Sequence, residues 1–164
     1  MSDVEMLAKR VLQACEERGL KLATAESCTG GMIAAAITDL AGASNVLERG
    51  FVTYSNEAKV EMLGVSPQTL GTRGAVSEET ALEMAAGALA HSRADIAVSV
   101  TGVAGPGGGT AEKPVGLVWF GLAVKGKEPR AQKRLFTGTR GQVRSESVAT
   151  ALSLMLEVSQ ERAP

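Results

Sequence analysis

The chain has 164 residues, of which 45% are hydrophobic, 21% charged and 3% aromatic, and its formal net charge is −1. This length fits one globular domain with a core of its own, and the near-neutral charge argues against a dedicated nucleic-acid binder. No apolar stretch approaches the roughly 20 residues of a membrane span, and the acidic N-terminus lacks the pattern of a secretory signal. We therefore expect one cytoplasmic α/β domain over residues 1–164 that binds neither nucleic acid nor a membrane.

The first half of the chain alternates helical and extended patterns. Apolar residues at helical spacing predict a helix over residues 4–15, and Gly19 ends it. The other elements expected in this half are strands at 21–25 and 47–54 and helices at 32–40, at 56–63 (capped by Asn56) and at 77–89 (beginning at Ser77).

The second half reads as three strands and a long helix. The continuous apolar run 96–100 is typical of a central strand. Residues 115–124 and 130–136 are extended patterns joined by the turn 125–129, which predicts an antiparallel pair. The last helix is expected at 141–161. The order of elements predicts a single-domain, layered α/β/α fold with a mixed, mostly parallel sheet.

The first candidate site is the turn after the first strand, Thr-Ala-Glu-Ser-Cys-Thr-Gly-Gly. Ser27 is a candidate nucleophile there, with Cys28 as its rival. The backbone N–H groups of Thr29, Gly30 and Gly31 could stabilise an oxyanion at the start of the next helix. The alternative is that Ser27 or Thr29 only caps that helix and that Cys28 packs in the core.

The second candidate site is the glycine-rich turn at residues 101–108, Thr-Gly-Val-Ala-Gly-Pro-Gly-Gly, which follows the 96–100 strand. It matches neither the dinucleotide fingerprint nor the Walker A loop. A loop of this kind can still wrap a phosphate, because glycine allows close backbone approach. We predict substrate contacts there; a flexible connecting loop is the alternative. The residues expected to make them are Thr101, Gly102, Ala104 and Gly105.

The residue types that are missing restrict the chemistry. The only histidine, His91, lies near a predicted helix end, and no His/Cys cluster or spaced carboxylate set has the pattern of a metal site. We therefore expect neither a metal nor a cofactor. A serine nucleophile would then need a lysine or tyrosine as its base. Tyr54 and Lys59 supply both types, and a partly desolvated lysine could accept a proton near pH 7. The alternative for Lys59 is a solvated helix residue.

Five segments together resemble one family, the CinA C-terminal domain. They are Thr-Ala-Glu-Ser-Cys-Thr-Gly-Gly (24–31), Gly-Phe-Val-Thr-Tyr-Ser-Asn-Glu-Ala-Lys (50–59), Gly-Ala-Val-Ser (74–77), Thr-Gly-Val-Ala-Gly-Pro-Gly-Gly (101–108) and Lys-Pro-Val-Gly-Leu-Val (113–118). The resemblance implies hydrolysis of the amide of nicotinamide mononucleotide (NMN) to nicotinic acid mononucleotide and ammonia, in the recycling of pyridine nucleotides. It also implies an enzyme that assembles, and we expect a homodimer.

The resemblance assigns roles residue by residue. It implies that Ser27 is the nucleophile, assisted by Tyr54 and Lys59, and leaves open which of these two takes the proton. For the 5′-phosphate of NMN we expect the 101–108 loop first, with Arg140 and Arg144 as weaker candidates.

Two other functions compete with the amidohydrolase. One is a non-catalytic, nucleotide-binding regulatory module associated with competence or DNA repair. The other is a nucleotide phosphatase or pyrophosphatase, which fits poorly because the sequence has no obvious metal site.

Overall fold

A five-stranded mixed sheet lies at the centre of the computed structural model, which describes residues 2–161; residues 1 and 162–164 of the predicted domain lie outside the described part. The strand order is β2-β1-β3-β4-β5. The strands are β1 (Leu22–Glu26), β2 (Leu47–Val52), β3 (Ile96–Gly102), β4 (Leu117–Val124) and β5 (Arg130–Leu135). β1 pairs in parallel with β2 and β3, whereas β4 is antiparallel to β3 and β5. Four strands therefore run in one direction and β4 in the other, which confirms the mixed, mostly parallel sheet.

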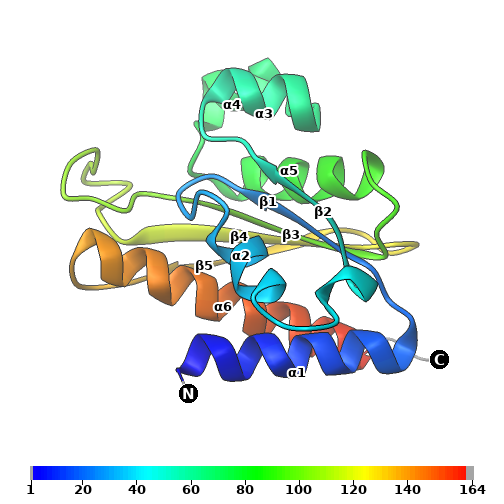
Figure 1. Cartoon of the computed structure of the whole chain (residues 1–164). Helices are drawn as coiled ribbons and strands as arrows, with labels where there is room; N and C mark the ends of the chain where they lie inside the picture. Colours follow the sequence, from blue (N-terminus) through cyan, green and yellow to red (C-terminus); the bar gives the residue numbers. More distant parts are fainter. Residues whose placement is uncertain (1, 162–164) are drawn as a thin grey trace.

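Helices cover both faces of this sheet (Figure 1). α1 and α6 pack side by side on one face with α2 beside them, whereas α5 lies on the opposite face and carries α3 and α4 on its outer side. The helices are α1 (Asp3–Arg18), α2 (Met32–Thr38), the short 3-10 helix η1 (Ala43–Asn45), α3 (Asn56–Leu63), α4 (Pro67–Arg73), α5 (Glu78–Ala90) and α6 (Arg140–Glu161). This arrangement confirms the predicted α/β/α layers. No helix within the described range is both long and apolar enough to cross a membrane.

The structure differs from the sequence prediction in several details. The short helix η1 was not predicted. Helix α2 ends at Thr38 and β4 begins at Leu117, each two residues from the predicted bound. Helix α4 was not predicted, because none of its residues is buried and it therefore has no apolar periodicity. The cap of α3 is Ser55, whose Oγ accepts a hydrogen bond from the N–H of Ala58 at 3.0 Å, and not Asn56. The second strand ends at Val52, two residues earlier than expected, so that Tyr54 lies in the connection to α3.

The two faces of the sheet are packed with side chains of different size. Large apolar residues face α1 and α6, whereas the face beneath α5 is built from small residues. The small residues of the α5 face are Ala23, Ala25, Ala97, Ser99, Gly121 and Ala123. Because these side chains are short, the backbone of α5 can approach the sheet closely, and this fixes the height of α5 above the strands.

Gly121 marks the closest point of this approach. A Cβ at Gly121 would collide with the carbonyl oxygen of Ala81 on α5 and with Ser99 Oγ. We expect Gly121→Ala to lower the free energy of unfolding by about 3 kcal/mol, because α5 or β4 must shift. Gly71→Ala is the matched control: it lies in α4 with open space around it, and we expect a gain of about 0.5–1 kcal/mol. Urea unfolding of both variants measures the difference, and equal stabilities would contradict this account.

Candidate active site

Most of the predicted site residues meet at one edge of the sheet, where β1, β2 and β3 end, but Thr29, Gly30, Gly31 and Gly105 do not line the cavity found there. A cavity of about 220 Å³ opens at this edge, as expected for ligand sites in open α/β sheets. It is lined by Ser27, Cys28, Tyr54, Asn56, Lys59, Ala75, Val76, Thr101, Gly102, Ala104 and Arg140. The structure therefore brings together segments that lie up to about a hundred residues apart in the sequence.

The centre of the cavity is a contact between Ser27 and Lys59. Ser27 directly follows β1, and Lys59 lies one turn into α3, where its side chain is only 1% exposed. Lys59 Nζ donates to Ser27 Oγ at 3.1 Å and to the carbonyl oxygens of Thr53 and Tyr54 at 3.0 and 3.3 Å. Burial lowers the pKa of the Lys59 ammonium below its usual value, because the interior solvates the charge poorly. The alternative of a solvated lysine is therefore wrong.

A buried carboxylate shapes the turn that carries Ser27. Glu26 is 1% exposed, and its Oε1 accepts hydrogen bonds from Thr29 Oγ1 at 2.6 Å and from the N–H groups of Gly31 and Ile33 at 3.2 and 2.9 Å. Its Oε2 accepts from the N–H of Ala34 at 3.1 Å. Glu26 thus pairs N–H groups at the start of α2 that have no partner within the helix.

Two of the three predicted oxyanion donors, Gly30 and Gly31, already have acceptors within the turn. The N–H of Gly31 is bound to Glu26, and the N–H of Gly30 donates to the carbonyl oxygen of Ser27 at 3.1 Å. Both glycines have positive φ, 58° and 105°, and this lets the turn bend back to make these contacts. Gly30 and Gly31 therefore shape the turn and have no N–H left for a ligand.

Tyr54 and Arg140 lie at the mouth of the cavity. The Tyr54 side chain is 64% exposed, and its hydroxyl accepts a hydrogen bond from Arg140 Nη2 at 3.3 Å. Arg140, at the start of α6, also donates from Nη1 to the carbonyl oxygen of Gly105 at 2.9 Å. Ser27 is thus hydrogen-bonded to Lys59, and the Tyr54 hydroxyl is hydrogen-bonded to Arg140. The Tyr54 hydroxyl makes no hydrogen bond to Ser27 or to the Lys59 amine.

The glycine-rich turn forms another wall of the cavity. Thr101 is buried, and its Oγ1 donates to the carbonyl oxygen of Ala75 at 2.9 Å, so its hydroxyl holds the neighbouring turn. Gly102 and Ala104 line the cavity directly. Gly105 has a φ of 81°, and a side chain there would collide with Val115.

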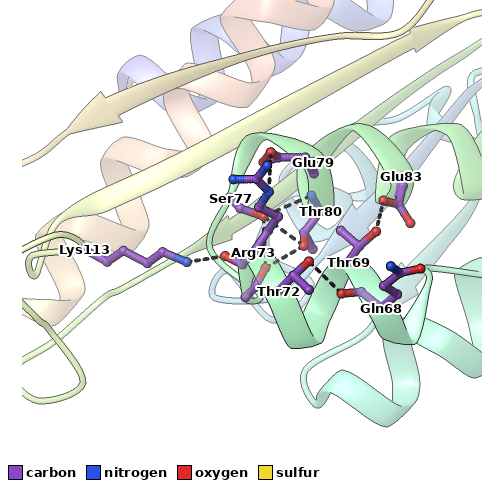
Figure 2. Close-up of polar contacts among 10 residues, drawn as sticks. Gln68, Thr69, Thr72, Arg73, Ser77, Glu79, Thr80, Glu83 and Lys113 are labelled. Atoms are coloured by element: carbon purple, nitrogen blue, oxygen red, sulfur yellow. Dashed lines mark hydrogen bonds and ion pairs between the residues drawn. The ribbon is translucent and has the colours of Figure 1, made fainter.

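The turn between α4 and α5 closes the cavity on the side of Ala75 and Val76. Ser77 Oγ and Thr80 Oγ1 both donate to the carbonyl oxygen of Gly74, at 2.9 and 2.7 Å. Figure 2 shows Ser77 and Thr80 beside the end of α4, with the Lys113 side chain reaching across to the carbonyl oxygen of Arg73. These contacts fix the turn against the segment that carries Lys113.

Sequence reasoning missed several residues around the site. Ala75, Val76 and Asn56 gave no signal of their own, since small or common side chains have no chemical signature. The role of Glu26 could have been suspected, because a position just before a helix is unusual for a buried acidic residue. Arg144 was expected as a weaker candidate for the phosphate, but the structure places it, half-buried, against the turn that carries Ser27 and not in the lining of the cavity. Arg144 Nε donates to the carbonyl oxygen of Cys28 at 3.0 Å.

The rival nucleophile, Cys28, is unsuited to that role. Burial raises the pKa of its thiol to about 11, and that of the Cys15 thiol to about 12. Since the thiolate is the reactive form, we expect iodoacetamide at pH 7 to leave both thiols of the folded protein unmodified over hours. Intact-mass measurement checks this, with a urea-unfolded sample as the positive control. Rapid alkylation of Cys28 in the folded protein would restore it as a candidate nucleophile.

A larger groove of about 690 Å³ shares only Val76 with this cavity. It runs between the start of α5 and strands β4 and β5, and it includes Trp119 with Lys133 Nζ 5.7 Å from the ring centre. None of the predicted site residues lines this groove. We therefore take the smaller cavity, and not the larger groove, as the candidate active site.

Comparison with known proteins identifies the family. The family model of the CinA C-terminal domain matches residues 4–159. The chain belongs to the CinA C-terminal domain family. Among its relatives, nicotinamide-nucleotide amidohydrolase PncC of Escherichia coli K12 is 52% identical over 154 residues, which cover 94% of this chain and 93% of that protein.

Other CinA proteins extend the comparison. A putative competence-damage inducible protein of Caldicellulosiruptor saccharolyticus is 50% identical over 93% of this chain, which corresponds to 37% of that longer protein. Among solved structures, the competence/damage inducible protein CihA of Agrobacterium tumefaciens has a TM-score of 0.93 at 50% identity and covers 96% of both chains. The CinA fold predicted from sequence is therefore confirmed.

Proposed function

We propose that this protein is an amidohydrolase that converts NMN to nicotinic acid mononucleotide and ammonia, and so returns the nucleotide to NAD synthesis. The observation that carries the proposal is the buried Lys59 amine, 3.1 Å from the Ser27 hydroxyl. A serine with a lysine base can form an acyl-enzyme without a histidine. The relatives named nicotinamide-nucleotide amidohydrolase support the choice of substrate.

Lys59 is the general base in this proposal. Its Nζ contacts Ser27 Oγ directly, whereas the Tyr54 phenol lies on Arg140. Burial lowers the pKa of Lys59 toward the pH at which an amine can accept a proton. Tyr54 then acts at the mouth of the cavity, where its hydroxyl can hydrogen bond to the bound nucleotide.

The chemistry follows from this pair. Ser27 Oγ forms a bond to the amide carbon while its proton passes to Lys59 Nζ, and the amide oxygen becomes an oxyanion. The C–N bond then breaks, and the nitrogen takes the proton from Lys59 and leaves as ammonia. Water then gives a proton to Lys59 Nζ and attacks the acyl carbon. The Ser27–acyl bond breaks, Lys59 returns the proton to Ser27 Oγ, and the product leaves as the carboxylic acid, which ionises in water.

The cavity also suggests how the nucleotide is oriented. At about 220 Å³ it is smaller than typical sites for whole ligands of 300 Å³ or more. We place the nicotinamide ring inside and the ribose phosphate at the mouth, where Arg140 carries a positive charge. The N–H groups of Ala104 and Gly105, which have no acceptor among residues 2–161, are further donors for the phosphate.

The direct test is product analysis of NMN incubated with the purified protein in EDTA. We expect ammonia and nicotinic acid mononucleotide in equal amounts, and slower turnover of nicotinamide riboside because it lacks the phosphate. A folded protein that releases neither product from NMN would refute the amidohydrolase. That result would favour the alternative, a non-catalytic nucleotide-binding module, which isothermal calorimetry with NMN would then examine.

A further inference from the structure

Two backbone N–H groups beside Ser27 have no hydrogen-bond acceptor in any other residue of the range 2–161. They belong to Cys28 and Thr29, whose residues are 6% and 0% exposed. The N–H groups that follow are all occupied, by the Ser27 carbonyl, the Glu26 carboxylate or the Thr29 carbonyl. Unpaired N–H groups in buried residues are rare in native proteins, because their desolvation is costly, and they call for an explanation.

Hydrogen bonds on the other side of this turn fix the direction of both N–H groups. Arg144, on α6, donates from Nε to the carbonyl oxygen of Cys28 at 3.0 Å and from Nη2 to that of Thr29 at 3.4 Å. In a trans peptide unit the carbonyl and the following N–H point in opposite directions. By holding the Cys28 carbonyl, Arg144 therefore turns the Thr29 N–H away from α6. The Ser27 carbonyl and the Cys28 N–H likewise belong to one peptide unit. Because the Gly30 N–H donates to the Ser27 carbonyl, the direction of the Cys28 N–H is fixed as well.

We propose that the N–H groups of Cys28 and Thr29 form the oxyanion hole and that Arg144 is the positioning residue that aims them. This inference rests on the proposed role of Ser27 as nucleophile. The Cys28 N–H follows Ser27 directly in the chain, and Cys28 lines the same cavity as Ser27. Without Arg144, the peptide between Cys28 and Thr29 can rotate, and a carbonyl dipole would then face the oxyanion in place of an N–H.

A merely structural tether between α6 and the turn predicts a different result. Loss of a tether lowers stability or substrate affinity, whereas loss of an oxyanion donor lowers kcat and leaves KM nearly unchanged. Arg144→Met keeps the length of the side chain and removes its donors, and Arg144→Lys restores one donor. Arg134→Met is the matched control, because within residues 2–161 the Arg134 side chain on β5 donates only to Gln132 and Lys133 of its own strand.

The experiment measures two reactions on these variants. The first is steady-state hydrolysis of NMN, and the second is phosphonylation of Ser27 by an alkyl fluorophosphonate, followed by intact mass. In the second reaction the Ser27 Oγ–P bond forms, the P–F bond breaks with loss of fluoride, and the Ser27 proton passes to Lys59. The phosphoryl oxygen of the fluorophosphonate would occupy the oxyanion hole. This reaction therefore tests the hole independently of the identity of the natural substrate. Ser27→Ala confirms the site of labelling, and thermal unfolding confirms that each variant is folded.

We expect Arg144→Met to lower both kcat and the phosphonylation rate by about 10- to 100-fold, with KM within about 3-fold of the wild type. Arg144→Lys should recover part of both rates, and it decides the matter if Arg144→Met does not fold. Unchanged rates, an effect on KM alone, or a wild type that is not phosphonylated at Ser27 would overturn the inference. A wild type that is phosphonylated but does not hydrolyse NMN would refute the proposed substrate, and the phosphonylation rates would still judge Arg144.

Discussion

Replacing Ser27 by Ala is expected to reduce kcat for NMN hydrolysis by about 10⁴-fold or more, because the acyl-enzyme can no longer form. The change removes one oxygen atom from a residue that is 9% exposed, and the Lys59 amine keeps the Thr53 and Tyr54 carbonyls as acceptors. The fold should therefore persist, and NMN should still bind. Initial rates of ammonia release and calorimetric binding of NMN to the variant measure the two effects separately.

The matched control is Ser153→Ala, an exposed serine on α6 away from the cavity. Its rate should equal that of the wild type. Normal turnover by a folded Ser27→Ala protein would show that Ser27 is not the nucleophile. Loss of NMN binding together with turnover would instead indicate that Ser27 contributes mainly to affinity.

Replacing Lys59 by Met is expected to lower kcat by about 10²- to 10⁴-fold, the usual contribution of a general base. In the wild type, the base works only as the neutral amine, so kcat should fall as pH is lowered through the pKa of Lys59. Because burial depresses that pKa, the midpoint should lie below the value of an ordinary lysine. The pH–rate profile of the wild type checks the position of the midpoint, and the residual rate of Lys59→Met should not show this limb.

The same substitution has a stability effect whose sign follows from linkage. The pKa of Lys59 is lower in the folded than in the unfolded chain, so the unfolded chain binds more protons between the two values. Between the folded and the unfolded pKa of Lys59, the free energy of unfolding of the wild type therefore rises with pH relative to that of Lys59→Met. Below the folded pKa, the difference in free energy between the two proteins is constant. Urea unfolding of both proteins between pH 6 and pH 10 measures it. A difference that does not vary with pH would show that the pKa of Lys59 is not depressed.

Much of the fold follows from local sequence patterns. The apolar spacing before Gly19, the run at 96–100 and the turn at 125–129 each predict an element that the structure contains, because burial of one helix face or one strand depends on periodicity. Helix α4 has no such pattern because none of its residues is fully buried. The residue types alone leave Ser27 or Cys28 as the nucleophile and Tyr54 or Lys59 as its base, since the chain offers a single histidine and no metal pattern. The resemblance to the CinA C-terminal domain is what implies the roles of Ser27, Tyr54 and Lys59.

The sequence by itself determined the order of the strands and of all helices except η1 and α4, the family and the set of candidate residues. Only the tertiary structure decided what these residues do to one another: that Lys59 is buried on Ser27, that Tyr54 lies on Arg140, and that Glu26 takes the N–H of Gly31. The physical reason is that pKa shifts and hydrogen bonds depend on distance and burial, and these arise where strands far apart in the chain end side by side. Local patterns describe which groups are available; the packing of α3 and α6 around the ends of β1 and β3 determines which of them meet.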